Sequence, residues 1–196
     1  MVTADEGMQR NRQSWDERVP AHVASDLYQG NLRDLRAGGD CLDPRIVEEV
    51  GDVAGKSLLH LQCHFGLDTL SWARRGAMAT GLDFSDPAID TASRLSDELQ
   101  LPARFVCANV YETPRAIEDR FDIVFASIGV LCWLPDLTRW AEVVATMLQP
   151  GGLFYIMEGH PFSYVFDDEH PTELRVKHDY FNRQPLVWGP GPSYAG

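Results

Sequence analysis

The chain has 196 residues, which suits one domain with a substantial core. Its formal net charge is −12 and its only lysines are Lys56 and Lys177, which argues against a nucleic-acid partner, because binding to phosphate backbones needs clustered Lys and Arg. The four cysteines have neither metal-ligand nor redox spacing, and the chain has no apolar signal core and no apolar run of membrane-spanning length. We therefore expect reduced thiols, no metal site, no membrane contact and a cytoplasmic location.

The N-terminal region is predicted to be a loose segment followed by helix. Residues 1–12 are polar and expected to be loose. Residues 11–28 carry apolar side chains at helical spacing, with an interruption at Pro20. Those side chains are Trp15, Val19, Val23 and Leu27. In the same stretch, His22 is expected to be a surface group.

The middle of the chain contains one strand–turn–helix–strand unit. A helix from Asp43–Pro44 to about residue 53 precedes it, since an aspartate followed by proline is a good helix start. In order, the parts of the unit are an apolar strand at 58–61, a tight turn at 64–66, a helix at 67–75 closed by Gly76, a strand at 77–82 and the acid Asp83. This order is typical of a parallel sheet that holds an adenosine-bearing cofactor beyond its strand ends.

The remaining elements continue the alternation of strands and helices. They are a helix at 86–98, strands at 103–107 and 121–126, an amphipathic helix at 136–148, a stop at 150–152 and a strand at 153–157. The helix at 136–148 is expected to bury Leu137, Trp140, Val144 and Met147. The pattern predicts an α/β fold with a doubly wound, mostly parallel sheet.

The tail departs from this pattern. Residues 162–196 are rich in Pro, Gly and aromatics, with weak strand character only at 174–176 and 186–188. We expect a short or truncated C-terminal region that leaves the last parallel strand as an open edge, which the tail or a second subunit in a homodimer would cover.

The glycine content of the turn after the first strand decides between cofactors. A dinucleotide needs several glycines there so that the backbone can approach a pyrophosphate, but this turn has only Gly66, with Gln62 and His64 at the earlier positions. S-adenosylmethionine has no phosphate and needs one close backbone approach and a carboxylate for its ribose hydroxyls. The sequence therefore favours S-adenosylmethionine.

Several segments in series resemble a known family. They are His60-Leu-Gln-Cys-His-Phe-Gly-Leu-Asp-Thr-Leu-Ser-Trp-Ala-Arg74, Gly81-Leu-Asp-Phe-Ser85, Phe121-Asp-Ile-Val-Phe125, Cys132-Trp-Leu-Pro-Asp136, Pro150-Gly-Gly152 and His160-Pro161. The series is similar to class I S-adenosylmethionine-dependent methyltransferases, in particular to a bacterial branch with a Gln-Cys-His-Phe-Gly motif I. The resemblance implies a Rossmann-like methyltransferase fold with an N-terminal helical lid at 1–42, a cofactor-binding core at 43–161 and a tail at 162–196.

The resemblance also implies a cofactor site. The predicted cofactor-binding residues are Gln62, Cys63, His64, Gly66, Asp83, Phe84, Asn109, Val110 and Ser127. Asp83 is expected to bind the ribose hydroxyls and Asn109 to accept a hydrogen bond from the adenine amino group. Asp68 is expected to cap its helix, with the cofactor's ammonium group as the other partner considered.

The acceptor side is less constrained by the sequence. Trp15, Tyr28 and Trp133 are the predicted substrate-binding residues, although Trp15 and Tyr28 also suit a packing role. The resemblance makes His22 a further lid candidate, as the alternative to the surface position expected for it. Methyl transfer from an activated sulfonium needs mainly proximity and alignment, and a base only where the acceptor must lose a proton. His160 is the candidate catalytic base, and a structural role before Pro161 is its alternative.

The sequence thus predicts methyl transfer from S-adenosylmethionine to a small-molecule acceptor. A non-catalytic cofactor-binding or interaction protein with a truncated methyltransferase fold is the first alternative. A nicotinamide-dependent oxidoreductase is the second, and the missing phosphate-binding glycines count against it. The acceptor, the methylated atom and the oligomeric state do not follow from the sequence.

Overall fold

A computed structural model describes residues 3–167, 170, 172–182 and 184. Its centre is a five-stranded, fully parallel sheet with the strand order β3-β2-β1-β4-β5. The strands are β1 Ser57–Leu61, β2 Met78–Asp83, β3 Ala103–Cys107, β4 Phe121–Ser127 and β5 Leu148–Met157. The predicted doubly wound parallel α/β fold is confirmed.

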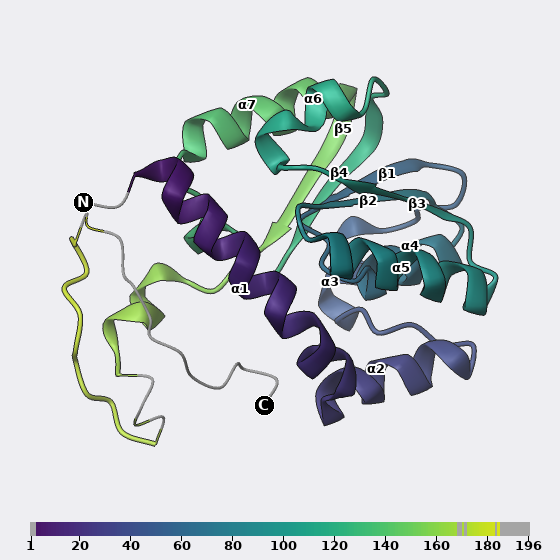
Figure 1. Cartoon of the computed structure of the whole chain (residues 1–196). Coiled ribbons are helices and arrows are strands. Elements are labelled where there is room, and N and C mark those ends of the chain that lie inside the picture. The colour runs from purple at the N-terminus through teal and green to yellow at the C-terminus, as the bar shows by residue number, and fades with distance from the viewer. Residues whose placement is uncertain (1–2, 168–169, 171, 183, 185–196) are drawn as a thin grey trace.

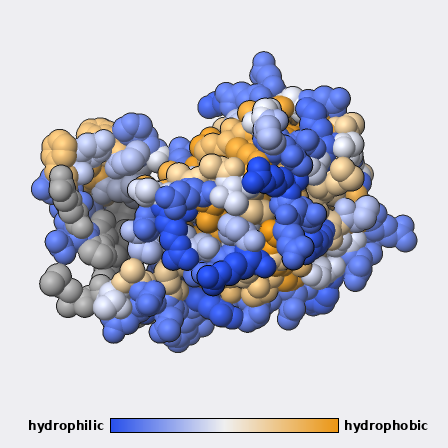
Figure 2. Space-filling view, turned by 90° about the horizontal axis from the view of Figure 1, so that it is seen from above, coloured by the Kyte–Doolittle hydropathy of each residue, from blue (hydrophilic) through white to orange (hydrophobic). Residues whose placement is uncertain are grey.

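Helices cover both faces of this sheet (Figure 1). The α-helices are α1 Ala4–Ala24, α2 Asp26–Arg36, α3 Pro44–Val50, α4 Leu67–Arg74, α5 Asp86–Leu99, α6 Thr113–Ala116 and α7 Leu137–Met147. Three short 3₁₀ helices are η1 Val110–Glu112, η2 Leu131–Trp133 and η3 Pro161–Val165. Helices α6 and α7 lie on one side of the sheet and α3, α4 and α5 on the other (Figure 1). Seen from the side of α6 and α7, the surface is mainly hydrophilic, with apolar side chains gathered near its middle (Figure 2).

Alternating side chains of the central strands build the core on both faces. Leu59 and Leu61 of β1 pack with α7, whereas Leu58 packs with α3 and α4. In β4, Val124 faces the α7 side and Phe125 the other. Burial on both faces explains why these strands read as continuous apolar runs rather than alternating ones.

The N-terminal region differs from the prediction. Residues from Ala4 onward are helical rather than loose, because Thr3 and Glu6 form a reciprocal capping box. The helix also continues through Pro20, and Val19 before it and His22 after it are both buried. The break falls at Ser25, whose hydroxyl caps α2.

Two further expectations near β5 are wrong. Pro150–Gly152 does not separate helix from strand, because β5 already begins at Leu148 and absorbs the segment as a register shift against β4. Gly151 permits this with a φ of 81°. Leu137 is exposed rather than buried, since it occupies the first turn of α7, beyond the part that lies on the sheet.

The tail contributes little regular structure. The predicted strand at 174–176 is reduced to one antiparallel bridge between Phe166 and Val176, and the predicted strand at 186–188 lies outside the described residues. Within the described ranges, no strand pairs with the outer edge of β5. Over the same ranges, no helix combines the length and the hydropathy that crossing a bilayer requires.

Candidate functional site

A cavity of about 510 Å³ lies at the carboxyl ends of β1, β2 and β4. Helix α1 forms one wall with Met8, Asn11 and Trp15, and Tyr28 of α2 continues that wall. The other walls come from the ends of the strands and the loops that follow β1, β2, β3 and β4. This is the edge where a doubly wound sheet binds ligands, because the loops that follow neighbouring strands diverge there.

The loop after β1 takes an unusual backbone conformation. Gln62 and His64 have positive φ angles of 56° and 52°, although neither is glycine. Such conformations cost on the order of 1 kcal/mol each and persist where the surroundings enforce them. Gln62 accepts a hydrogen bond from Trp140 Nε1 at 3.1 Å and donates to the Val130 carbonyl at 3.5 Å, so its side chain ties this loop to α7 and to the loop after β4. His64 lines the cavity, and its Nε2 is buried without a hydrogen-bond partner.

Gly66 begins α4 and is required by its surroundings. Its φ is 78°, and a Cβ there would lie 2.6 Å from the Phe105 ring. Glycine is therefore needed at this position because the Phe105 ring packs against it, and Gly66 also lines the cavity. Gly66 is also the N-cap of α4, and no side chain caps this helix. The expectation that Asp68 caps it is wrong, because the carboxylate turns toward the end of β4 instead.

Asp83 lies at the end of β2 and is only 6% exposed. Its two oxygens accept hydrogen bonds from the backbone amides of His64 at 2.8 Å and Ser85 at 2.9 Å. Burial raises the pKa of this carboxyl to about 6, and the amide hydrogen bonds counteract that rise in part. Each carboxylate oxygen has more than one acceptor position, so both can still accept from hydroxyl groups in the cavity.

Only some of the residues predicted to contact adenine line the cavity. Phe84 and Val110 line it, as does the neighbouring Ala108. Asn109 does not, because its Oδ1 accepts a hydrogen bond from the Tyr111 amide at 3.0 Å and caps η1. It lines a second hollow of about 390 Å³ that borders Phe84.

A polar chain lies beneath the cavity between β1, α4 and β4. The Ser127 hydroxyl donates to Asp68 Oδ2 at 2.8 Å and lies 3.1 Å from His60 Nε2. His60 is 2% exposed, its Nδ1 lies 2.9 Å from Thr69 Oγ1, and burial lowers its pKa to about 3. Burial also raises the pKa of Asp68. Asp68, Ser127 and His60 all line the cavity.

Aromatic rings form a further part of the cavity wall. The ring of Trp15 lies 5.4 Å from that of Trp133 and 5.3 Å from that of His64, and Tyr28 lies 5.9 Å from His64. The structure thus brings the three predicted substrate-binding residues together. His22 stacks on Tyr28 at 5.6 Å and is fully buried, so the expectation of a surface group is wrong. His22 lies on the inner face of α1, the face that also carries Trp15 and the apolar residues at helical spacing.

His160, the predicted base, is not among the residues that line the cavity. It is exposed, and its Nδ1 accepts a hydrogen bond from the Phe162 amide at 3.1 Å as the N-cap of η3. The nearby Glu158 has a clear structural role, because its carboxylate accepts hydrogen bonds from the amides of Gly129, Val130 and Leu131 at 2.6–2.9 Å. It thereby fixes the loop that carries Trp133.

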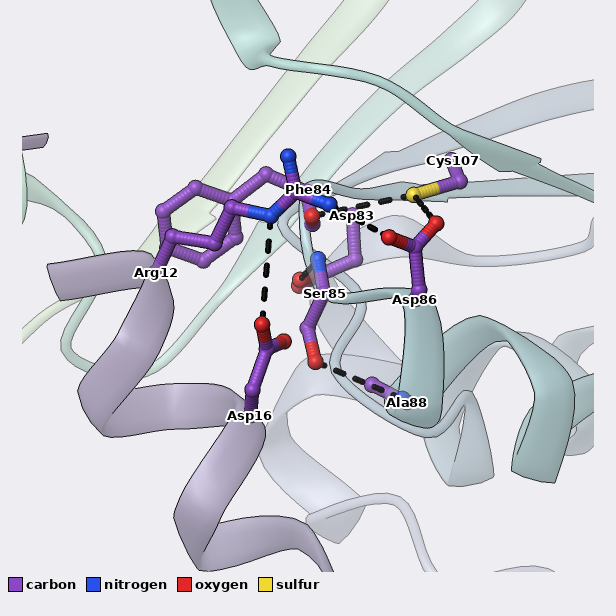
Figure 3. A network of polar contacts seen from close by, with 8 residues as sticks. All are labelled: Arg12, Asp16, Asp83, Phe84, Ser85, Asp86, Ala88 and Cys107. Carbon is purple, nitrogen blue, oxygen red and sulfur yellow. Dashed lines mark hydrogen bonds and ion pairs between the residues drawn. The ribbon is translucent and has the colours of Figure 1, made fainter. Parts of the chain in front are cut away.

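Helix α1 is attached on both sides of the cavity. On one side the Arg12 guanidinium pairs with Asp86 at the start of α5, and Asp86 also accepts a hydrogen bond from the Cys107 thiol at 2.9 Å (Figure 3). On the other side Asn11 Nδ2 donates to the Trp133 carbonyl at 3.2 Å. These contacts hold α1 across the carboxyl ends of the strands.

Sequence reasoning missed His60 and Asn11 as cavity residues. His60 lies in the middle of an otherwise apolar strand, and a lone histidine in such a run was the available signal. Asn11 gave no signal, because its position depends on how α1 packs over the sheet.

The family model described as "Methyltransferase domain" matches residues 59–156, which is half of the chain. The ubiquinone biosynthesis O-methyltransferase of Alkalilimnicola ehrlichii is 30% identical over 123 residues, covering 62% of this chain and 49% of that protein. That of Coxiella burnetii is 30% identical over 111 residues, or 57% and 47% of the two chains. This chain therefore spans about half the length of the curated relatives it matches.

Solved structures show the same fold. An S-adenosylmethionine-dependent methyltransferase from Mesorhizobium loti superposes with a TM-score of 0.53 at 24% identity, covering 63% of this chain and 56% of that one. Phosphoethanolamine N-methyltransferase 1 of Haemonchus contortus, in complex with phosphoethanolamine and S-adenosylhomocysteine, gives a TM-score of 0.63 at 14% identity over 95% of this chain and 38% of that one. At these identities the likeness concerns the fold.

Proposed function

This chain belongs to the family of methyltransferase domains, and on that premise we propose that it transfers a methyl group from S-adenosylmethionine to a small-molecule acceptor bound in the cavity at the carboxyl ends of β1, β2 and β4. Membership of the family confirms the predicted class and its cofactor. The acceptor and the role of each residue are our proposals.

The observation that carries the proposal is the charge of the cavity wall. Among the described residues, those that line the cavity include two carboxylates, Asp68 and Asp83, and no Lys or Arg. A pyrophosphate would need cations or a glycine-rich loop, whereas a nucleoside with a free diol and a positive charge suits two carboxylates, of which Asp83 is buried and Asp68 partly buried. In addition, the buried Nε2 of His64 has no hydrogen-bond partner among the described residues, and a bound ligand would supply one.

We assign the cofactor to the walls on either side of β1. Asp83 accepts hydrogen bonds from the ribose hydroxyls, and Phe84 and Val110 hold the adenine. Gln62, Cys63, His64 and Gly66 shape the loop beneath it, and Ser127 closes the far side. Asn109 stays a prediction that needs its side chain to leave Tyr111.

We assign the acceptor to the aromatic wall. When bound, S-adenosylmethionine supplies a methyl group on a positively charged sulfur, which a lone pair of the acceptor can displace in line. Trp15, Tyr28 and Trp133 would hold a flat acceptor and exclude water, so that alignment supplies much of the rate. His160 would have to approach the cavity before it could serve as a base.

The two N-terminal helices of the predicted lid, residues 1–42, suit this reaction. Helices α1 and α2 contribute Trp15 and Tyr28 to the wall, and α1 is attached on both sides of the cavity. A lid of this kind would exclude water from the sulfonium and release the product when it opens.

A ligand panel tests the proposal. S-adenosylmethionine and S-adenosylhomocysteine should raise the melting temperature in a concentration-dependent way, and NAD should not. Single-turnover transfer of a labelled methyl group should then be found with at least one member of a panel of phenols, catechols and amines. Binding without transfer to any acceptor would favour the non-catalytic alternative, and stabilisation by NAD alone would reject the proposal.

The compartment and the assembly stay predictions. The four cysteines are unpaired in the structure, as expected for a reducing cytoplasm. A homodimer would cover Leu153 and Phe154, which β5 exposes at the edge of the sheet. Light scattering at several protein concentrations measures that state.

A further inference from the structure

Trp133 reaches the cavity from a short loop and not from the core. It ends η2, in the loop after β4, and lines the cavity. Its neighbours Leu131 and Leu134 pack against the core cluster on the α7 side of the sheet, whereas Trp133 is not among the described residues of that cluster. A large side chain outside the core keeps a single orientation only where other groups hold it.

Helix α1 contacts Trp133 at two points. The Asn11 Nδ2 donates to the Trp133 carbonyl at 3.2 Å, across 122 positions of sequence. The Trp15 ring meets the Trp133 ring edge to face, with their centroids 5.4 Å apart. Residues four apart in a helix lie on the same face, one turn from each other. One face of α1 therefore holds both the backbone and the ring of Trp133.

The hydrogen bond from Asn11 completes the support of this loop. The carboxylate of Glu158 accepts from the amides of residues 129–131, at the beginning of the loop. The Trp133 carbonyl lies at the other end, where the last carbonyls of a helix have no partner within it. Asn11 supplies that partner, so the end of the loop that carries the ring depends on α1.

Adjacent residues of α1 attach the helix to opposite sides of the cavity. Arg12 pairs with Asp86 at the start of α5, which follows β2 (Figure 3). Asn11 bonds the loop that follows β4. Strand β1 lies between β2 and β4 in the sheet, so the two attachments lie on either side of it. A substitution at Asn11 should therefore release the β4 side and leave the β2 side, with Asp83, in place.

We propose that Asn11 is a positioning residue for the methyl acceptor. Through the Trp133 carbonyl it fixes the ring against which the acceptor lies, so the acceptor wall is complete only while α1 lies across the strand ends. The inference rests on the proposed function and deepens it. It gives a residue of the N-terminal helix a role in acceptor use that is separate from cofactor binding.

Tryptophan fluorescence tests the structural half of this inference without an acceptor. In the unliganded protein, Asn11→Ala should raise the acrylamide quenching constant, because Trp133 loses its attachment to α1 and becomes more accessible. The same substitution made together with Trp133→Phe should leave the quenching constant unchanged, which assigns the difference to Trp133. Asn11→Asp keeps the size of the side chain but removes the donor, and should behave as Asn11→Ala does. Asn11→Gln keeps an amide donor and should recover part of the protection.

Steady-state kinetics test the functional half, with the member of the acceptor panel that is methylated fastest. Asn11→Ala should lower kcat/KM for that acceptor about fivefold, as expected for one neutral hydrogen bond, and should leave the KM for S-adenosylmethionine within about twofold. In a Trp133→Ala background the loss from Asn11→Ala should disappear, because a residue that acts through Trp133 has nothing left to position. A merely structural role of Asn11 would lower both cofactor and acceptor parameters.

A matched variant on the same helix controls both measurements. Gln13 is exposed on α1, and its amide donates to Glu17 within the helix. Gln13→Ala also removes a side-chain amide from α1 but none of its contacts with the cavity. It should therefore quench as the wild type does and keep its kcat/KM.

The outcomes separate the inference from its premise. Unchanged quenching in Asn11→Ala would overturn the inference, and so would losses that multiply in the double variant, because Asn11 would then act independently of Trp133. If no panel member is methylated, the quenching comparison decides alone. Failure of the wild-type protein to bind S-adenosylhomocysteine would reject the proposed function, whereas the quenching result would still show whether Asn11 holds Trp133.

Discussion

The two carboxylates of the cavity are held in opposite ways. Asp83 accepts hydrogen bonds from the backbone amides of His64 and Ser85. Asp68 accepts from side chains, chiefly the hydroxyl of Ser127, at the end of another strand. Asp83 is buried and Asp68 is partly buried, and both have a raised pKa, so the main difference lies in what fixes their position.

Backbone amides and side chains give these sites different tolerance to change. The amides around Asp83 stay in place whatever their side chains are, provided that the turn keeps its conformation. The support of Asp68 disappears when one hydroxyl is removed. We therefore expect the Asp83 end of the cavity to be robust to neighbouring substitutions and the Asp68 end to be sensitive to them.

The largest expected effect is that of removing the backbone-held charge. Asp83→Asn should weaken S-adenosylhomocysteine binding by about 100-fold, because the side chain loses its charge toward two ribose hydroxyls and one of its polar atoms becomes a donor facing a backbone donor. Titration calorimetry measures it with S-adenosylhomocysteine and with 5′-methylthioadenosine, which carries the same thioether nucleoside without the amino acid. Both ligands have the ribose diol, so this change should affect them equally.

A nearby carboxylate controls that experiment. Asp90 is exposed on α5, and Asp90→Asn should bind as the wild type does. A smaller loss in Asp83→Asn than in Asp68→Asn would contradict the comparison. From the sequence, Asp83→Ala is expected to leave the fold intact. The structure adds that alanine would leave the amides of His64 and Ser85 without this acceptor, so we expect Asp83→Ala to lose stability as well.

The same contrast explains what the sequence could predict. The strand–turn–helix–strand unit, Gly66 and Asp83 follow one another within a short stretch, so local patterns place them. The Asp68 site is assembled from α4, β1 and β4, and Ser127 follows Asp68 by 59 positions. No local pattern reports such a contact, and helix capping was therefore the natural but wrong expectation for Asp68. The position of His160 outside the cavity could not be predicted for the same reason, since the path of the chain after β5 is set by η3 and not by the strand pattern.

The next effect concerns pH and separates binding from stability. The pKa of Asp83 is raised to about 6 by burial and by the Asp16 charge on α1, against hydrogen bonds from the backbone of Ser85, His64 and Phe84. Because the unliganded folded state holds this proton more tightly than the unfolded state does, the Asp83 contribution to stability is lost as pH rises from about 4 through 6, by at most about 3 kcal/mol. Binding runs the other way, since the ribose needs the carboxylate as an acceptor. Affinity for methylthioadenosine should fall about tenfold per pH unit below 6.

This pH dependence should belong to Asp83. In Asp83→Asn the slope of methylthioadenosine affinity between pH 4.5 and 6 should disappear. Chemical denaturation of the unliganded variant should likewise no longer show the fall in stability as pH rises through this range. A slope that persists in the variant would assign the titration to another group and would remove the link between burial of Asp83 and binding.

A smaller effect tests whether backbone-held carboxylates also stabilise loops. Glu158 accepts from three consecutive amides, so Glu158→Gln should lower the free energy of unfolding by about 1 kcal/mol by turning one acceptor atom into a donor. Cofactor affinity should change little, whereas acceptor turnover should fall because the loop carries Trp133. Urea denaturation measures the first effect. Equal stability in wild type and variant would show that the loop is held mainly by packing of Val130 and Leu131.

The smallest effect concerns a third kind of contact, the exposed ion pair, which differs from the two carboxylates of the cavity. Arg12 and Asp86 are each about half exposed or more, so their pairing contributes little to stability, on the order of 0–1 kcal/mol. Arg12→Ala should therefore leave the melting temperature almost unchanged, yet it should speed S-adenosylhomocysteine dissociation up to about threefold at low salt, because, of the pairing with Asp86 and the hydrogen bond from Asn11, α1 then keeps only the second. In 0.5 M salt the wild type and the variant should converge, since screening removes the pair that the substitution deletes. Stopped-flow displacement measures both rates. A difference that survives high salt would mean that Arg12 acts through packing on α5 or on the cavity wall. The attachment of α1 would then depend on side-chain packing, as the position of Asp68 depends on the Ser127 side chain, and not on a screened surface charge pair.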